Sequence, residues 1–222
     1  MKFKILIFTF LPLIFFAQMK TDRPGFATAT DIVSKGNLQS ENGLNYLHDN
    51  DEFSSDHLFR YGVAKDFELR LETNQNYDDA ENSTYTFSGK YNFLNGSDSS
   101  PALTFIGISD FKIENYSAFL AANQSLSDKF NLQINSGYKK EDHFNYLFMI
   151  TNLGYSISDK WSLFAEYYGN YTAKDSPDHN ADFGLSYTPS NRLEFDISAG
   201  SSLDNISKNY FINAGFSFAL FK

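Results

Sequence analysis

The chain has 222 residues, no cysteine, a formal net charge of −9 at pH 7, and 18% aromatic residues, of which 24 are Phe and 14 are Tyr. The lack of cysteine excludes a disulfide framework and a lipid-modified N-terminal cysteine. The acidic balance argues against a nucleic-acid partner, which needs a basic surface. The aromatic content fits either the core of a soluble β-sandwich or the outer face of a membrane barrel.

Residues 1–18 have the pattern of an export signal. Lys2 and Lys4 precede an apolar run at residues 5–16, and the small residue Ala17 follows it. The run is too short to span a bilayer, which takes ~20 apolar residues, so a membrane anchor or a buried helix is the weaker interpretation. We expect cleavage near Ala17.

Residues 19–36 form a polar segment before the first predicted strand. It contains Thr21, Asp22, Arg23 and Pro24, and the proline prevents simple continuation of a strand. The segment could fold over the periplasmic mouth of a barrel, with Asp22 and Arg23 paired to interior charges, or it could remain a loose tail. The sequence leaves both open.

From residue 37 to residue 222 the chain alternates apolar and polar residues, in runs separated by turn-formers. Twelve strands are predicted, at residues 37–48, 54–64, 67–77, 82–94, 101–112, 114–125, 129–140, 143–157, 161–173, 177–188, 192–204 and 208–221. These lengths match the ~9–11 residues that cross a bilayer, whereas globular strands average ~5–6. The pattern predicts an all-β fold, a closed antiparallel transmembrane β-barrel of the meander type with about twelve strands.

The connections between these strands alternate in length. Tight turns at residues 64–66, 127–129, 158–160 and 189–191 alternate with longer acidic loops at 48–55, 77–82, 139–143, 174–180 and 204–208. Barrels of the outer membrane have short periplasmic turns and longer external loops. An aromatic follows three of the turns at hairpin-length spacing, at Phe67, Phe130 and Trp161, which suits a meander.

The polar face of the predicted strands is rich in charge. On this register the inward residues are Glu41, Arg60, Glu68, Arg70, Glu72, Lys90, Glu166, Asp182, Arg192, Glu194 and Asp196. Such charges could line a water path and select permeants. They could equally pair with one another and fill the interior. The two interpretations have even weight, and neither makes these residues catalytic.

The residues suited to catalysis or metal binding are not clustered in the sequence. The histidines His48, His57, His143 and His179 are scattered over loops and strand ends, and nothing near them marks a nucleophile. We expect no enzyme activity, no cofactor and no metal. Acidic residues of the outer loops, among them Asp51, Asp56 and Asp78, are expected to be solvated rather than to bind divalent cations.

Several motifs follow one another in an order that resembles a known family. They are Thr21-Asp22-Arg23-Pro24, Phe59-Arg60-Tyr61-Gly62-Val63, Phe67-Glu68-Leu69-Arg70-Leu71 and Leu193-Glu194-Phe195-Asp196-Ile197. Over nearly the whole mature chain this order resembles the outer-membrane proteins grouped as the putative phenol-degradation meta-pathway transporter family. The resemblance implies a barrel that transports small compounds, hydrophobic or aromatic ones included, with no agreed catalytic residues. The chain departs from many relatives at Gly25-Phe26-Ala27, where they carry a further acidic residue.

The sequence therefore predicts an exported protein of the outer membrane of a Gram-negative bacterium, with the barrel over residues 37–222. The expected partners are outer-membrane lipid, lipopolysaccharide, the outer-membrane assembly machinery and a small-molecule permeant. The expected function is passive transport of small compounds. The alternative is a structural or surface-interaction barrel with a filled lumen and no transport, and a strand number between those of small filled barrels and open porins does not decide between them.

Overall fold

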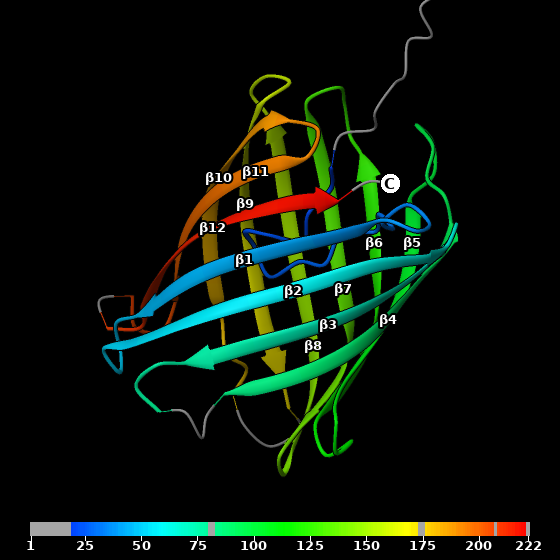
Figure 1. Cartoon of the computed structure of the whole chain (residues 1–222). Coiled ribbons are helices and arrows are strands. Elements are labelled where there is room, and N and C mark those ends of the chain that lie inside the picture. The colour runs from blue at the N-terminus through cyan, green and yellow to red at the C-terminus, as the bar shows by residue number, and fades with distance from the viewer. Residues whose placement is uncertain (1–18, 80–82, 173–175, 207, 221–222) are drawn as a thin grey trace, which may run out of the picture.

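The computed structural model describes residues 19–79, 83–172, 176–206 and 208–220, and the export signal predicted at residues 1–18 lies outside these ranges. Twelve strands form one closed barrel, in which each strand pairs antiparallel with the next and β1 closes against β12 (Figure 1). The strands are β1 (Leu38–Leu47), β2 (Glu52–Ala64), β3 (Phe67–Asn76), β4 (Thr84–Leu94), β5 (Ala102–Asp110), β6 (Tyr116–Ser125), β7 (Phe130–Glu141), β8 (Phe144–Ser156), β9 (Trp161–Tyr171), β10 (Asn180–Ser190), β11 (Leu193–Ser202) and β12 (Tyr210–Leu220). The predicted fold class and strand number are confirmed.

The sequence alternation decides which face each residue takes. In β3, Leu69 and Leu71 are 49% and 41% exposed, whereas Glu68 and Arg70 between them are 0% and 7% exposed. All twelve strands place at least one large apolar side chain on the outside. An apolar outer face around a polar interior is the arrangement of a membrane barrel, because lipid and not water covers the outside. No helix in the described ranges is long and apolar enough to cross a membrane.

The interior is polar over most of its surface. One small apolar cluster of Ile106, Phe119 and Ala121 lies on the inner face of β5 and β6, with Ile108 and Phe148 packed against it. Elsewhere, apart from Leu58 on β2, Ala219 on β12 and the glycines, the buried wall residues are charged or carry amide and hydroxyl groups. Such groups must find hydrogen-bond partners inside the barrel, since an unpaired buried polar group costs ~1–3 kcal/mol.

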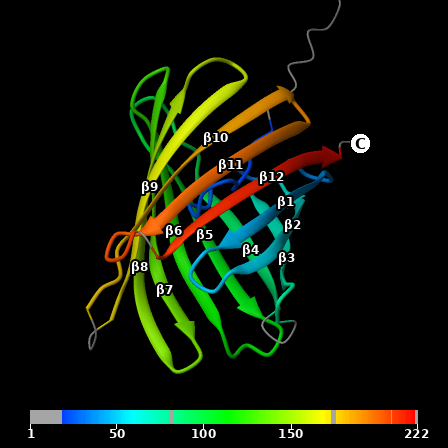
Figure 2. The same cartoon turned by 90° about the vertical axis from the view of Figure 1, so that its left-hand side faces the viewer.

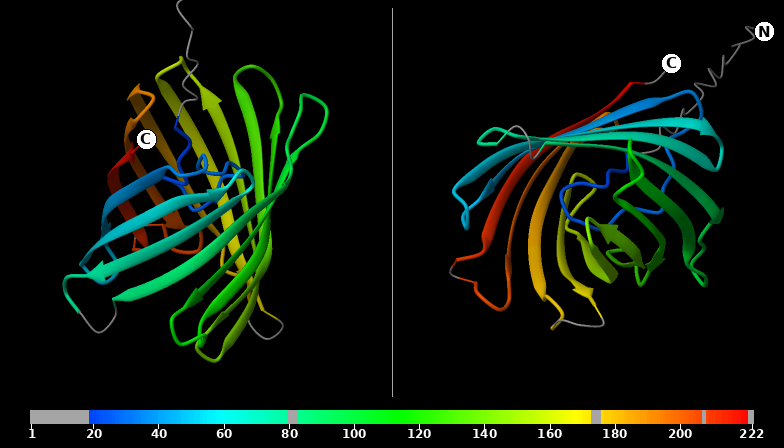
Figure 3. Two further views of the ribbon diagram at one scale, coloured as in Figure 1. Left: turned by 45° about the vertical axis from the view of Figure 1, so that its right-hand side comes forward. Right: turned by 90° about the horizontal axis from the view of Figure 1, so that it is seen from below.

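Residues 19–36 supply many of those partners, because they lie inside the barrel. Figure 2 shows this segment behind the front strands, and the view along the barrel in Figure 3 places it within the ring of strands. The segment leaves the lumen through a tight contact with β2: Gly36 donates a hydrogen bond to the carbonyl of Gly62 at 2.7 Å. A Cβ atom on Gly62 would lie 2.2 Å from the carbonyl oxygen of Val33. Only glycine permits this approach.

Candidate functional site in the barrel lumen

The backbone of residues 19–36 is irregular and pairs with no neighbouring strand over most of its length. Its N–H and C=O groups therefore need hydrogen-bond partners from side chains. Wall carboxylates accept its N–H groups: Glu41 those of Asp22 and Arg23, Glu166 those of Phe26 and Ala27, and Glu68 that of Val33. Side chains of the wall donate hydrogen bonds to five carbonyl groups of the segment. Gln39 and Arg60 donate to the carbonyl of Lys20, and Arg60 also donates to that of Asp31. The other three carbonyls are those of Thr28, which accepts from Gln133 and Asn135, Thr30, which accepts from Asn92 and Thr104, and Pro24, which accepts from Ser198. The polar wall therefore solvates the N-terminal segment.

Three wall cations converge on Asp22. The nearest nitrogen of Arg70 is 2.7 Å from its carboxylate, that of Lys90 is 3.5 Å away, and that of Arg60 is 3.7 Å away. Burial alone would raise the pKa of Asp22, but the three cations outweigh burial and hold that pKa below its usual range. Asp22 is therefore ionised in the folded protein and pins the segment to β2, β3 and β4.

Arg60 is the centre of this cation cluster. Its side chain is fully buried and forms ion pairs with Glu68 at 2.8 Å and Glu41 at 2.7 Å. Because Glu41 and Glu68 also accept backbone N–H groups of the segment, one connected network joins the wall to residues 19–36. Networks of this kind hold one arrangement rigidly when every member is satisfied.

Arg23 points to a different part of the wall. Its guanidinium pairs with Asp196 on β11 at 3.0 Å and with Asp56 on β2 at 2.6 Å, and it donates to the amide oxygen of Asn213 on β12. Thr21 donates to Glu194 at 2.7 Å, and Pro24 follows Arg23 through a cis peptide bond. The four residues of the N-terminal motif thus contact an arc of the wall that runs from β11 through β12, β1 and β2 to β4.

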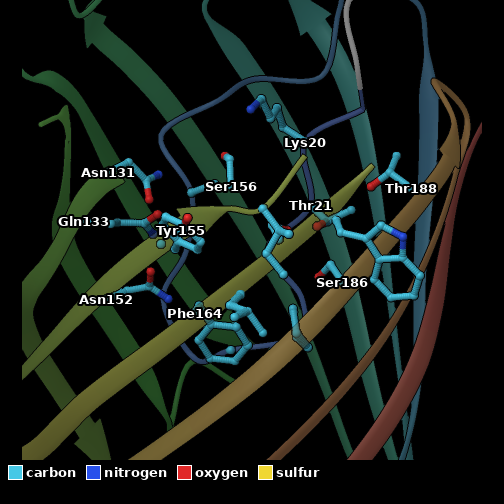
Figure 4. A pocket seen from close by; sticks show the side chains of 18 of the residues that line it. Lys20, Thr21, Asn131, Gln133, Asn152, Tyr155, Ser156, Phe164, Ser186 and Thr188 are labelled. Carbon is cyan, nitrogen blue, oxygen red and sulfur yellow. The ribbon is translucent and has the colours of Figure 1, made fainter. Parts of the chain in front are cut away.

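A cavity of about 640 Å³ lies beside the segment. Figure 4 shows Asn131, Gln133 and Asn152 along one side of it and Ser186 and Thr188 along the other. The cavity extends inward from the turns at residues 127–129 and 157–160 as far as Glu166 and Gly25. Its lining of amides and hydroxyls can form hydrogen bonds with a small polar molecule.

Most of the predicted interior charges do lie inside the barrel. Glu41, Arg60, Glu68, Arg70, Lys90, Glu166, Asp182, Glu194 and Asp196 are buried, and Glu72 is half-buried. The prediction for Arg192 is wrong. This residue is exposed in the turn before β11, which begins at Leu193, so the alternation of that strand does not extend to it.

The structure also adds residues that the sequence analysis missed. Asp56 was expected to be a solvated loop residue, but it lies in β2 and binds Arg23. Its spacing of four residues from Arg60 in one strand is the signal that could have found it, since residues at even spacing share a face. Among the described residues, no group of three or more His, Asp or Glu side chains is placed to hold a metal ion.

Comparisons with known proteins agree with this architecture. The KdgM porin superposes with a TM-score of 0.66 at 14% identity, over 82% of this chain and 99% of that one. The NanC porin gives 0.64 at 11% identity, over 82% and 100%, and the outer membrane protein Omp33 of Acinetobacter baumannii gives 0.53 at 12% identity, over 82% and 97%. At these identities the likeness shows the fold. No curated protein matches the chain in sequence.

A family model does match, over residues 21–220. The match begins at the N-terminal motif and ends at the last residue of β12, so it includes both the barrel and the segment inside it. The chain belongs to the family described as "Putative MetA-pathway of phenol degradation".

Proposed function

We propose that the protein is a channel of the bacterial outer membrane that passes small polar solutes passively, through a lumen narrowed by residues 19–36. The observation that carries this proposal is the polar cavity of about 640 Å³, which reaches the turn end of the barrel. The apolar outer face, the export signal predicted from the sequence and the porin-type fold support insertion in an outer membrane, with the short turns on the periplasmic side.

The charge of the wall supports a preference against anions. Six buried wall carboxylates face three buried wall cations among the described residues. The cations lie on β2, β3 and β4, whereas four of the carboxylates lie on β9, β10 and β11. Fixed charge in a narrow, weakly hydrated lumen sets the entry barrier for ions. The excess of carboxylates therefore favours cationic and neutral solutes.

The family description points to small aromatic compounds, and the cavity offers groups that suit a hydroxylated ring. Tyr155 and Phe164 contribute aromatic surface to its lining, and Asn131 and Gln133 contribute amides. Aromatic permeants are thus part of the proposal, as compounds that combine a ring with hydrogen-bonding groups.

One observation favours the alternative function, a filled barrel that does not transport. Gly25 and Ala27 lie at the inner end of the cavity, where Glu166 holds the backbone N–H groups of Phe26 at 2.7 Å and Ala27 at 3.1 Å. A segment fixed in this way would block flux unless it moves.

Solute flux into liposomes distinguishes the two functions. We expect the full mature protein to admit glucosamine fastest, glucose next and gluconate slowest, because these solutes are similar in size and differ in charge. Glu194→Gln, which removes a carboxylate from the cavity lining, should narrow the ratio of glucosamine to gluconate flux. Asp98→Asn, in an exposed turn outside the cavity, is the matched control and should leave the ratio unchanged. No flux of any of the three solutes would instead establish the filled barrel for this class of permeant.

A further inference from the structure

The side chain of Arg23 occupies a recess whose shape and charge match a guanidinium group. Its Nε and Nη2 atoms donate to the two carboxylate oxygens of Asp196 at 3.3 and 3.0 Å, and Nη1 donates to Asp56 at 2.6 Å. Nη2 also donates to Asn213. A pair of parallel bonds to one carboxylate is the geometry that distinguishes a planar guanidinium from a point-like ammonium.

The wall is flat where this planar group lies. A Cβ atom on Gly43 would stand 2.1 Å from Nη1 of Arg23, and one on Gly215 would stand 2.3 Å from Nη2. Gly43 and Gly215 are directly paired across β1 and β12. Any other residue at either position would fill the recess, so the two glycines form its floor.

Two of the three groups that bind Arg23 are held in place by the wall itself. The amide of Asn45 donates to the second carboxylate oxygen of Asp56 at 2.7 Å, and its oxygen accepts a hydrogen bond from the amide of Asn213. Asn45 therefore links two of the three groups that bind Arg23, and all of these groups belong to the wall. Neighbours of this kind orient the groups that bind a ligand, so Asp56 and Asn213 stay placed for a guanidinium group when Arg23 is removed.

We propose that this recess, formed by Asp56, Asp196 and Asn213 over Gly43 and Gly215, is a binding site for small guanidinium compounds, which Arg23 occupies as a tethered ligand. The tether gives Arg23 a high effective concentration, so a soluble compound competes poorly while the segment is in place. When Arg23 is removed, two carboxylates lose their cation and the recess is vacant. The site then accepts a soluble alkylguanidinium ion.

Rescue of the Arg23→Ala variant by ethylguanidinium tests the proposal. Thermal unfolding of purified protein in detergent is measured with ethylguanidinium or ethylammonium, which carry the same charge. We expect Arg23→Ala to melt below the wild type and to regain melting temperature in a saturable way with ethylguanidinium. The apparent Kd should be at least about tenfold tighter than for ethylammonium, since only the planar ion forms the paired bonds. The wild type should show no saturable rise.

The floor of the recess provides the matched control. In Arg23→Ala combined with Gly215→Ala, a methyl group occupies the place of Nη2, and we expect the rescue to disappear. If Arg23→Ala does not fold, Arg23→Gln is used in its place, with titration calorimetry as the measurement. An equal response to both ions, a saturable response in the wild type, or rescue that survives Gly215→Ala would overturn the proposal. Because binding is measured without a membrane, failure of the channel function would leave this result unaffected.

Discussion

The buried network predicts a large effect for Arg60→Met. Arg60 donates five hydrogen bonds: two to Glu68, one to Glu41, and one each to the carbonyls of Lys20 and Asp31. Methionine fills a similar length of the lumen but replaces none of these bonds. Glu41 and Glu68 then remain buried with one cation fewer, and breaking a buried pair in this way costs ~3–5 kcal/mol. We expect the free energy of unfolding to fall by about that amount.

Urea unfolding in lipid vesicles, followed by the fluorescence of Trp161, measures the change, because this is the only tryptophan of the chain. Lys65→Met is the control: it replaces a cation by the same residue at an exposed turn and should alter stability by no more than ~0.5 kcal/mol. Equal losses for the two variants would refute the idea that the interior network stabilises the barrel.

Three further predictions concern the outer face, the orientation and the pH response. Leu71→Arg, in the middle of the lipid face of β3, should cost ~2–4 kcal/mol in the same urea assay, whereas Leu71→Met should cost less than ~1.5 kcal/mol; a similar loss for both would place this face away from lipid. A cysteine at Asp51 should react with an impermeant reagent in intact cells, while one at Asp159 should react only after the outer membrane is permeabilised, and the reverse pattern would invert the orientation. Because the folded-state pKa of Asp22 is below its usual 3.8, its stabilising effect is present above pH ~4 and is lost as the pH falls further. Pepsin cleavage within residues 19–36, divided at each pH by the cleavage rate of an unfolded substrate, should therefore rise with acidification. The rise should be smaller in Asp22→Asn, in which only the other carboxylates that hold the segment titrate, and an equal rise in both proteins would contradict the role of Asp22.

The strands could be predicted from the sequence because each one faces two different environments. Every predicted strand end lies within three residues of the observed one, and the alternation in β3 assigned Leu71 and Arg70 to the correct faces. Alternation carries no information beyond the end of a strand, which explains the error at Arg192. Asp56 was misplaced for another reason: it falls in the strand predicted at residues 54–64, but it was grouped with the acidic residues of the preceding loop.

The path of residues 19–36 could not be predicted in the same way. The segment has no period, and its partners are far away in the sequence: Arg23 contacts Asp196, 173 residues later, and Asn213, 190 residues later. The motif at Thr21 to Pro24 indicated that these residues were important, and pairing of Asp22 and Arg23 with interior charges was one of two interpretations. Which charge each residue would meet depends on barrel closure, which no local pattern encodes.

The position of Arg23 also bears on how the protein assembles. Its partners belong to β2 on one side and to β11 and β12 on the other, and the pairing of β1 with β12 lies between them. In an open sheet these groups are separated, so the complete set of contacts forms only after the last strand has joined the first. We therefore expect the N-terminal segment, although it precedes the barrel in the chain, to complete its contacts only after the barrel has closed. In the closed barrel, Arg23 connects the strands on the two sides of the β1–β12 pairing. Before closure, Asp56 and Asp196 lack this shared cation.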